Sequence, residues 1–351
     1  MTAVTRPLTQ PFTSVKQDAI TAVLSFWLMT GLMIDGWAHA TRGGVESFFT
    51  PWHAAFYSGF AATAAWIAYL ILTPPRQIGG GSVRARVPIG YRLGLSGVVI
   101  FGIGGVLDLV WHELLGIEVN IDALLSPTQM VLLAGAMLIV TTPIRSSWHR
   151  PTPRDSKWSW VAPAIVATGL SALLAQFFLF YASGWQEPAF RFRWEPGDDF
   201  LVVFSVLSLT ASTVIFMGAA LLILQRWAPP FGAFTAILGI IGLGLQGLHG
   251  FEQPGDLVGA LVAGLALDFL AFRLRPSPTT PSLFRAWAFL APIVVWTAHA
   301  LYLALIGEFG WPPVLWGAIL LQGLVGVALS VIAVPARLPA ETTRERRLWS
   351  H

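Results

Sequence analysis

Long apolar stretches separated by short polar segments run through the whole sequence. Each stretch has about 20 residues, the length that an α-helix needs to cross a hydrocarbon core roughly 30 Å thick. The pattern therefore predicts an all-α polytopic membrane bundle of about ten transmembrane helices, and the eighth is expected to be the short one. The predicted spans are 19–40, 51–73, 91–114, 124–144, 158–183, 200–225, 231–250, 255–273, 285–307 and 313–335.

The basic residues are concentrated in every second segment between these spans. All of the 21 Lys and Arg residues except Arg42, Arg191 and Arg193 fall on the same side as the N-terminus. Because Lys and Arg mark cytoplasmic segments, both termini are expected in the cytoplasm. The predicted division is a cytoplasmic tail over 1–18, a single transmembrane domain over 19–336 and a charged cytoplasmic tail over 337–351.

The composition supports a membrane protein and narrows its chemistry. The chain is 55% hydrophobic and 11% charged, whereas an ordinary soluble domain is roughly 25% charged. Its net charge of +3 does not indicate nucleic acid as a partner, since the basic residues follow the topology. The absence of cysteine excludes disulfides, zinc–thiolate sites, iron–sulfur clusters and thiol catalysis. The expected location is the bacterial cytoplasmic membrane, with the lipid bilayer as partner.

Three polar side chains near the first outer loop stand out in an apolar setting. Asp35 and His39 are four residues apart, so they share one helix face about 6 Å apart along the axis. The Thr-Pro pair at 50–51 has the N-cap and N1 residues of a helix start, which places His53 in the first helical turn. A tight antiparallel pair would bring all three to one depth near the outer membrane face. Two imidazoles and one carboxylate suit copper, zinc or iron, and copper has the highest intrinsic affinity of these.

The same pattern recurs in the next pair of spans. Asp108 and His112 are again four residues apart, and a Ser-Pro pair at 126–127 starts the following helix. Aligned on the prolines, Gln129 takes the place of His53, and an amide is a poor ligand for a transition metal. We therefore expect an altered second site, which holds a second metal or relays protons. The predicted repeat units are 19–73 and 91–144.

Further polar residues are candidates for a supporting role at the same face. Glu118 and Asp122 lie in the loop of the second hairpin and could supply oxygen ligands. His249 and His299 lie toward the outer ends of the seventh and ninth spans. Each of these histidines is either a ligand, a partner of a ligand, or a satisfied core residue.

The first hairpin resembles a metal-site hairpin in the membrane C subunit of the particulate methane and ammonia monooxygenases. In that family an Asn or Asp precedes a His by four residues, and a second His follows a Pro at the next helix start. The segment IDALLSPTQM at 121–130 resembles that subunit's other hairpin, which ends in Thr-Pro-Thr-His where this chain has Gln129.

The resemblance implies a copper protein that oxidises small apolar substrates with dioxygen. By position, Asp35, His39 and His53 would form one ligand set, and Asp108 and His112 would belong to the other. The resulting prediction is a monooxygenase-like oxidoreductase acting on a small lipophilic substrate. Partner subunits are expected on separate chains, or the protein is a homo-oligomer.

Two other classes of function stay open at this point. A metal transporter needs ionisable groups near the membrane midplane, whereas here they cluster at one interface, which argues against a path through the protein. A metal sensor or metal-insertion factor without catalysis fits the same ligands. The three residues of the first hairpin would also suit a hydrogen-bonded cluster that ties two helices together.

Overall fold

The computed structural model of the protein consists of helices, and the described residues contain no β-strand. The charged tail predicted over 337–351 lies outside the described residues. The described residues are 11–42, 48–73, 83–116, 121–155, 157–185, 189–193, 195, 197–252 and 254–335.

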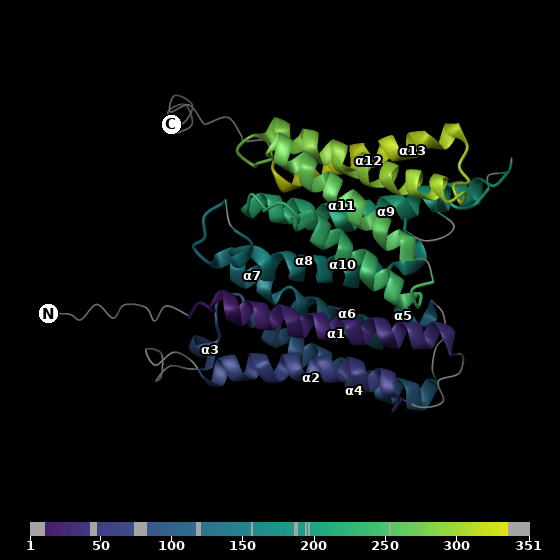
Figure 1. Ribbon diagram of the computed structural model, residues 1–351. Helices are drawn as coiled ribbons and strands as arrows, with labels where there is room; N and C mark the ends of the chain where they lie inside the picture. The colour runs from purple at the N-terminus through teal and green to yellow at the C-terminus, as the bar shows by residue number, and fades with distance from the viewer. Residues whose placement is uncertain are drawn as a thin grey trace, which may run out of the picture.

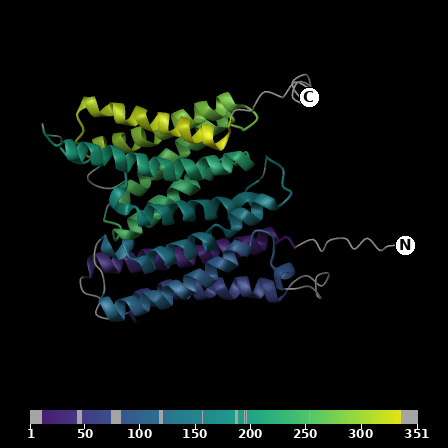
Figure 2. The same ribbon diagram turned by 180° about the vertical axis from the view of Figure 1, so that it is seen from behind.

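Ten apolar helices lie side by side and confirm the predicted membrane bundle. Within the described chain, nine helices are long and apolar enough to cross a membrane, and one further apolar helix is shorter. Figures 1 and 2 show them as successive layers, from the purple and blue helices at one end to the yellow helices at the other. The main helices are α1 (Val15–Thr41), α2 (Pro51–Leu72), α4 (Arg92–Leu115), α6 (Pro127–Val140), α7 (Thr142–His149), α8 (Trp158–Phe178), α9 (Asp199–Arg226), α10 (Ala233–Leu248), α11 (Pro254–Leu274), α12 (Pro281–Leu305) and α13 (Gly317–Ala333), with shorter elements α3 (Val83–Arg86), α5 (Asp122–Leu125), η2 (Phe180–Ala182) and η3 (Pro313–Trp316). Helices α6 and α7 together count as one span, Pro127–His149, and η3 with α13 as another, Pro313–Ala333.

Helix α8 joins the two halves of the bundle. It packs against α1 and α7 on one side and against α9 and α10 on the other. It is also the most deeply buried of the candidate spans. The hairpins α1–α2 and α4–α6 therefore meet the C-terminal helices mainly across α8, and α1 also contacts α10 directly.

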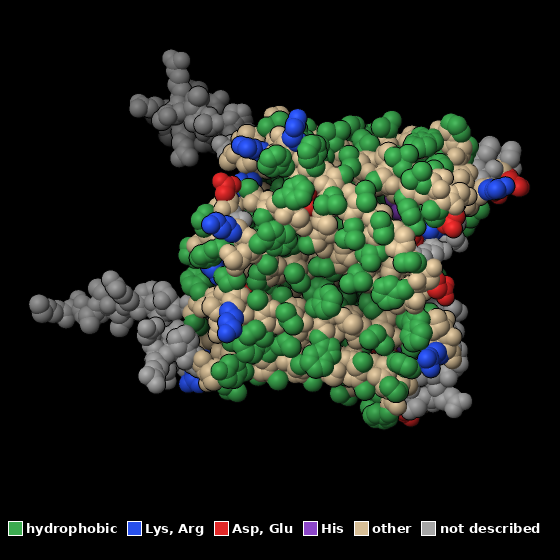
Figure 3. All heavy atoms as spheres, viewed as in Figure 1, with side chains coloured by type: hydrophobic (Ala, Val, Ile, Leu, Met, Phe, Trp, Pro, Cys, Tyr) green, Lys and Arg blue, Asp and Glu red, His purple; other side chains and the backbone are tan. Residues whose placement is uncertain are grey.

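Charged side chains are separated by sign along the helix axes. On the face shown in Figure 3, most Lys and Arg side chains lie at the end where α1 begins. Most Asp and Glu side chains lie at the opposite end, and the surface between them is apolar. We refer to these as the basic end and the acidic end.

The short helix of the bundle is the seventh, so the prediction of a short eighth span is wrong. Helix α10 has 16 residues, which make it about 24 Å long, whereas α11 has 21. The backbone N–H groups in the first turn of α10 find their hydrogen-bond acceptor inside the protein, on Asp268 of α11. That carboxylate accepts hydrogen bonds from the backbone N–H of Phe234 at 3.0 Å and of Thr235 at 2.9 Å. A hydropathy pattern does not detect such a cap, because Asp268 lies on a different helix.

A second buried carboxylate organises the basic end. Asp18 is fully buried and accepts hydrogen bonds from the hydroxyls of Thr13, Tyr91 and Ser146 at 2.8, 2.8 and 2.9 Å. Arg150 forms an ion pair with it. A buried charge is tolerated only when it is paired and hydrogen-bonded, so this network fastens the start of α1 to α4 and α7.

Two glycines allow the backbones of α1 and α2 to approach closely. A Cβ atom added at Gly31 would lie 2.6 Å from Cα of Phe56, and one added at Gly59 would lie 2.6 Å from Cα of Leu28. Both are backbone contacts, which a neighbour cannot relieve by changing rotamer. Small residues at helix crossings are a common means of close packing in membranes.

The same reciprocal contacts recur between α4 and α6. A Cβ atom added at Gly104 would lie 3.1 Å from the side chain of Leu132, and one added at Gly135 would lie 2.6 Å from the backbone N of Phe101. These four residues are the positions that align with the α1–α2 contacts when the Asp-x3-His motifs and the prolines are superimposed. The contacts therefore agree with the predicted hairpin repeat.

We predict that Gly135→Ala destabilises the protein by about 1–3 kcal/mol, the usual range for overpacking. The added methyl group would meet the α4 backbone, which can move only if the two helices separate. The measurement is a denaturation midpoint of the purified protein in detergent. Gly218→Ala is the matched control, because a Cβ at Gly218 meets nothing within 4 Å. Equal midpoints for the two variants would contradict the close-approach argument.

Candidate metal centre

The structure brings Asp35, His39 and His53 together at the acidic end. Asp35 and His39 lie on the last turns of α1. The Thr50 side chain caps α2 by accepting a hydrogen bond from the His53 N–H at 3.1 Å, and Pro51 is its first residue. Within the described residues, this triad is the one group of three or more potential ligands able to hold a metal ion, with all ligand atoms within 4.8 Å of one another.

The distances within the triad are those of ligands around one metal ion. Nε2 of His39 lies 3.4 Å from Nε2 of His53. The carboxylate of Asp35 lies 3.5 Å from His53 Nε2 through Oδ1 and 3.9 Å from His39 Nε2 through Oδ2. Ligands about 2.1 Å from a tetrahedral ion stand about 3.4 Å apart. The His39–His53 and His53–Asp35 distances are close to that value, whereas His39 is nearest to the other oxygen of Asp35, at 3.9 Å.

The orientation of His53 is fixed by its other ring nitrogen. Nδ1 donates a hydrogen bond to the backbone carbonyl oxygen of Phe48 at 2.5 Å. A carbonyl can only accept, so the Nδ1 atom carries a proton, and Nε2 is the ring nitrogen that faces the triad and could bind a metal ion. Metal-ligating histidines usually have such a second contact.

The Asp35 carboxylate has a further property of a ligand. Its Oδ1 atom is buried and makes no hydrogen bond with any described residue. Leaving a buried carboxylate oxygen without a donor is costly, and a cation held with His39 and His53 would satisfy it. The donor set therefore fits a transition-metal ion.

The second hairpin holds its polar residues differently. Asp108 Oδ1 accepts hydrogen bonds from the Thr128 hydroxyl at 3.0 Å and from the Gln129 amide at 3.1 Å. His112 Nε2 lies 3.6 Å from Asp108 Oδ2. Gln129 thus occupies the place of His53 as a donor to the aspartate, and not as a second nitrogen ligand.

Both hairpins contribute to one cavity of about 260 Å³. The imidazoles of His53 and His112 have ring centroids 6.4 Å apart, and the ring of Phe48 lies 4.8 and 6.0 Å from them. The candidate sites of the first and the second hairpin, which are separate in the sequence, are therefore neighbours in the structure. The cavity is lined by Leu32, Asp35, Gly36, His39, Ala40, His53, His112, Leu124, Gln129, Phe177, Phe180, Leu248 and His249.

The remaining predicted residues have different outcomes. His249 lines the cavity from the end of α10. His299 is buried elsewhere, among the rings of Trp185 and Phe190. Glu118 and the side chain of Asp122 lie outside the described residues.

Several residues at the centre carry no signal in the sequence. Phe48 acts through its carbonyl group and its ring, and Phe177 and Phe180 reach the cavity from α8 and η2. Tyr57 packs against Phe48 with ring centroids 5.8 Å apart. Aromatic residues are common in an apolar chain, so the sequence does not distinguish these four. Only the folded structure shows that they surround the candidate metal ligands, Phe177 through the packing of α8 against α1.

Comparisons with known proteins add nothing to this geometry. No family model, curated protein or solved structure matches the chain. A function has to be argued from the residues of the site.

We predict that His53→Gln abolishes metal binding, with affinity falling at least about 100-fold, since even residues behind a ligand contribute 10–100-fold. A glutamine at 53 would donate to Asp35 as Gln129 donates to Asp108, so the hairpin should keep its fold. The measurement is metal content per chain after dialysis. His149→Gln, an exposed residue at the basic end, is the control and should retain full metal content.

We predict the opposite change for Gln129→His. This variant would give the second hairpin the Asp, His and His of the first, so metal content per chain should rise and not fall. The Ser126 cap and Pro127 are unaffected by the exchange, which leaves the helix start intact. An unchanged metal content would show that Asp108 and His112 cannot complete a ligand set.

Proposed function

We propose that the protein is an integral membrane copper protein that oxidises a small lipophilic substrate at the acidic end of the bundle. The observation that carries this proposal is the convergence of Asp35, His39 and His53, whose nearest ligand atoms are 3.4–3.9 Å apart. A further support is the resemblance of this hairpin to the copper-binding C subunit of the particulate methane and ammonia monooxygenases.

Copper is favoured by the chemistry of the donors. Among divalent first-row metals, copper binds nitrogen and oxygen ligands most tightly, while zinc and iron accept the same set. His39 and His53 would hold the ion, and Asp35 would contribute a charged oxygen. A bound copper ion would supply redox chemistry that no side chain of this chain provides.

The walls of the cavity indicate the class of substrate. Leu32, Phe177 and Leu248 present apolar surface beside the triad, which limits water near the ligands and favours an apolar molecule. A volume of about 260 Å³ lies just below the usual range of roughly 300–1,000 Å³ for ligand pockets. The substrate would therefore be small, and the bilayer is a reservoir from which it can arrive.

The orientation in the membrane is part of the proposal. By the positive-inside rule we take the basic end to be the cytoplasmic side, so the proposed metal centre would lie at the outer face of a bacterial cytoplasmic membrane. Partner subunits on separate chains, or further copies of this chain, would complete an enzyme of the resembled kind.

Transport is a weaker explanation of the same residues. The polar networks around Asp35 and Asp18 lie at opposite ends of α1. Between them α1 has no charged side chain, and the buried residues are apolar, such as Leu28 and Phe56, or hydroxyl-bearing, such as Ser25. A carrier would need ionisable groups near the midplane.

We predict about one copper ion per chain in protein purified without added chelator. We also predict dioxygen consumption when a small apolar substrate is present together with a two-electron reductant such as a quinol, because one oxygen atom enters the substrate and the other leaves as water. The first measurement is elemental analysis with electron paramagnetic resonance, which should show nitrogen coupling from two imidazoles. A chelator should remove the signal, and Cu²⁺ should restore it. Zinc in place of copper would exclude the redox proposal. Copper without dioxygen consumption would leave a sensor or insertion factor as the function.

A further inference from the structure

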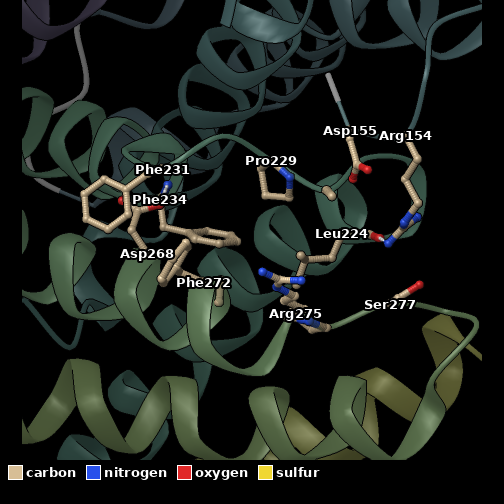
Figure 4. Close-up of a pocket in the computed structure, with 13 residues that line it drawn as sticks. Arg154, Asp155, Leu224, Pro229, Phe231, Phe234, Asp268, Phe272, Arg275 and Ser277 are labelled. Atoms are coloured by element: carbon tan, nitrogen blue, oxygen red, sulfur yellow. Dashed lines mark hydrogen bonds between the residues drawn. The ribbon is translucent and has the colours of Figure 1, made fainter. Parts of the chain in front are cut away.

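The basic end contains a second and larger cavity, of about 500 Å³. It lies between the loop before α8, the loop before α10 and the end of α11. Figure 4 shows its aromatic side chains, including Phe231 and Phe272, on one side and Arg154 with Asp155 on the other. Arg275 lies between the two groups.

We propose that this cavity binds the phosphate headgroup of an anionic phospholipid. Basic pockets between transmembrane helices on the cytoplasmic side are typical places for such headgroups. The proposal goes beyond the metal centre, because the two cavities lie at opposite ends of the bundle and have no lining residue in common.

Arg275 is the residue best placed to meet a phosphate. Its side chain is exposed in the cavity, and no described residue forms a hydrogen bond or ion pair with its guanidinium group. It ends α11 in a left-handed backbone conformation, with φ of 48°, which usually favours glycine or asparagine. An arginine at this position presents a planar fork of donors that suits phosphate oxygens.

Arg154 forms the opposite wall and is held in place. Its Nη2 and Nη1 atoms donate hydrogen bonds to the carbonyl oxygens of Leu224 at 2.9 Å and Gln225 at 3.3 Å. The guanidinium group is therefore fixed at the C-terminal end of α9, where its charge adds to that of Arg275.

Two carboxylates also line the cavity and equal its two arginines in number, but neither forms an ion pair with Arg275. Asp268 is already engaged by the N-terminus of α10, including the hydroxyl of Thr235 at 2.6 Å. Asp155 is exposed and lies beside Arg154. Arg275 is left as the charge without a counter-ion among the described residues.

The apolar side of the cavity favours a lipid over a soluble phosphate. Phe231 and Phe272 are large apolar side chains that would normally be buried in an aqueous setting, yet they are 57% and 62% exposed. Trp158 donates from its indole N–H to the carbonyl of Phe231 at 3.0 Å, an arrangement expected at a membrane interface. A phospholipid would place its phosphate at the arginines and its acyl chains along these rings.

The test compares lipids retained by the purified protein in native mass spectrometry. Dioleoyl phosphatidylglycerol should be retained in preference to dioleoyl phosphatidylcholine. Arg275→Gln should reduce that retention about fivefold, the contribution of one basic residue near an anionic headgroup. Glutamine also has a Cβ atom, so the variant keeps the same left-handed backbone strain at position 275. Equal retention of the two lipids by the unsubstituted protein would overturn the proposal, whether or not the variant folds.

Arg273→Gln is the matched control. Arg273 lies at the same end of α11 and carries the same charge, but it stacks over Phe269 and does not line the cavity. Its substitution should change lipid retention less than twofold. An equal loss of retention in both variants would mean that the lipid responds to the overall charge of this surface and not to Arg275, which contradicts the proposal. Glycerol 3-phosphate supplies the headgroup without acyl chains. If it binds as tightly as the lipid and depends on Arg275, the cavity is a soluble-phosphate site and the lipid assignment fails.

Discussion

The close approach of α1 to α2 determines where the candidate metal ligands lie. Asp35 and His39 are on one helix and His53 is on the other, so their separation depends on the distance between the two axes. Gly31 and Gly59 set that distance through backbone contacts that any Cβ atom would prevent. A larger interaxial distance would move His53 away from Asp35 without altering either helix. The chemistry at the acidic end therefore rests on packing within the hydrocarbon region.

The buried aspartates show how unusual the first hairpin is. Asp18, Asp108 and Asp268 each receive hydrogen bonds from hydroxyl, amide or guanidinium groups. Asp35 instead faces two imidazole nitrogens, and its Oδ1 accepts no hydrogen bond from the described residues. Imidazoles are the donors that bind transition metals, whereas the partners of Asp18 and Asp268 suit a structural role. Asp108 is intermediate, because it faces the imidazole of His112 as well as its hydroxyl and amide donors. The comparison makes Asp35 the buried aspartate whose surroundings best suit a metal ion among these four.

The sequence was informative where the physics is local. The Asp-x3-His spacing and the Thr-Pro helix start place the triad, because each depends on a few consecutive residues. The contribution of α8 was not predictable, since Phe177 has no property that separates it from other apolar residues. The short helix was misassigned for a related reason. Its cap is Asp268, 34 residues from Phe234 along the chain, and a hydropathy pattern cannot predict a contact between residues so far apart.

Helix α10 connects the two cavities of the molecule. Its first turn is capped by Asp268, which lines the cavity at the basic end, and its last residue, Leu248, lines the metal cavity. At about 24 Å for 16 residues, it is shorter than the hydrocarbon core, roughly 30 Å thick. Residues at or next to each end of this one helix therefore line a different cavity, Phe234 at the basic end and Leu248 at the acidic end. Because α10 is packed against both α8 and α11, the walls of the two cavities depend on the same helix contacts.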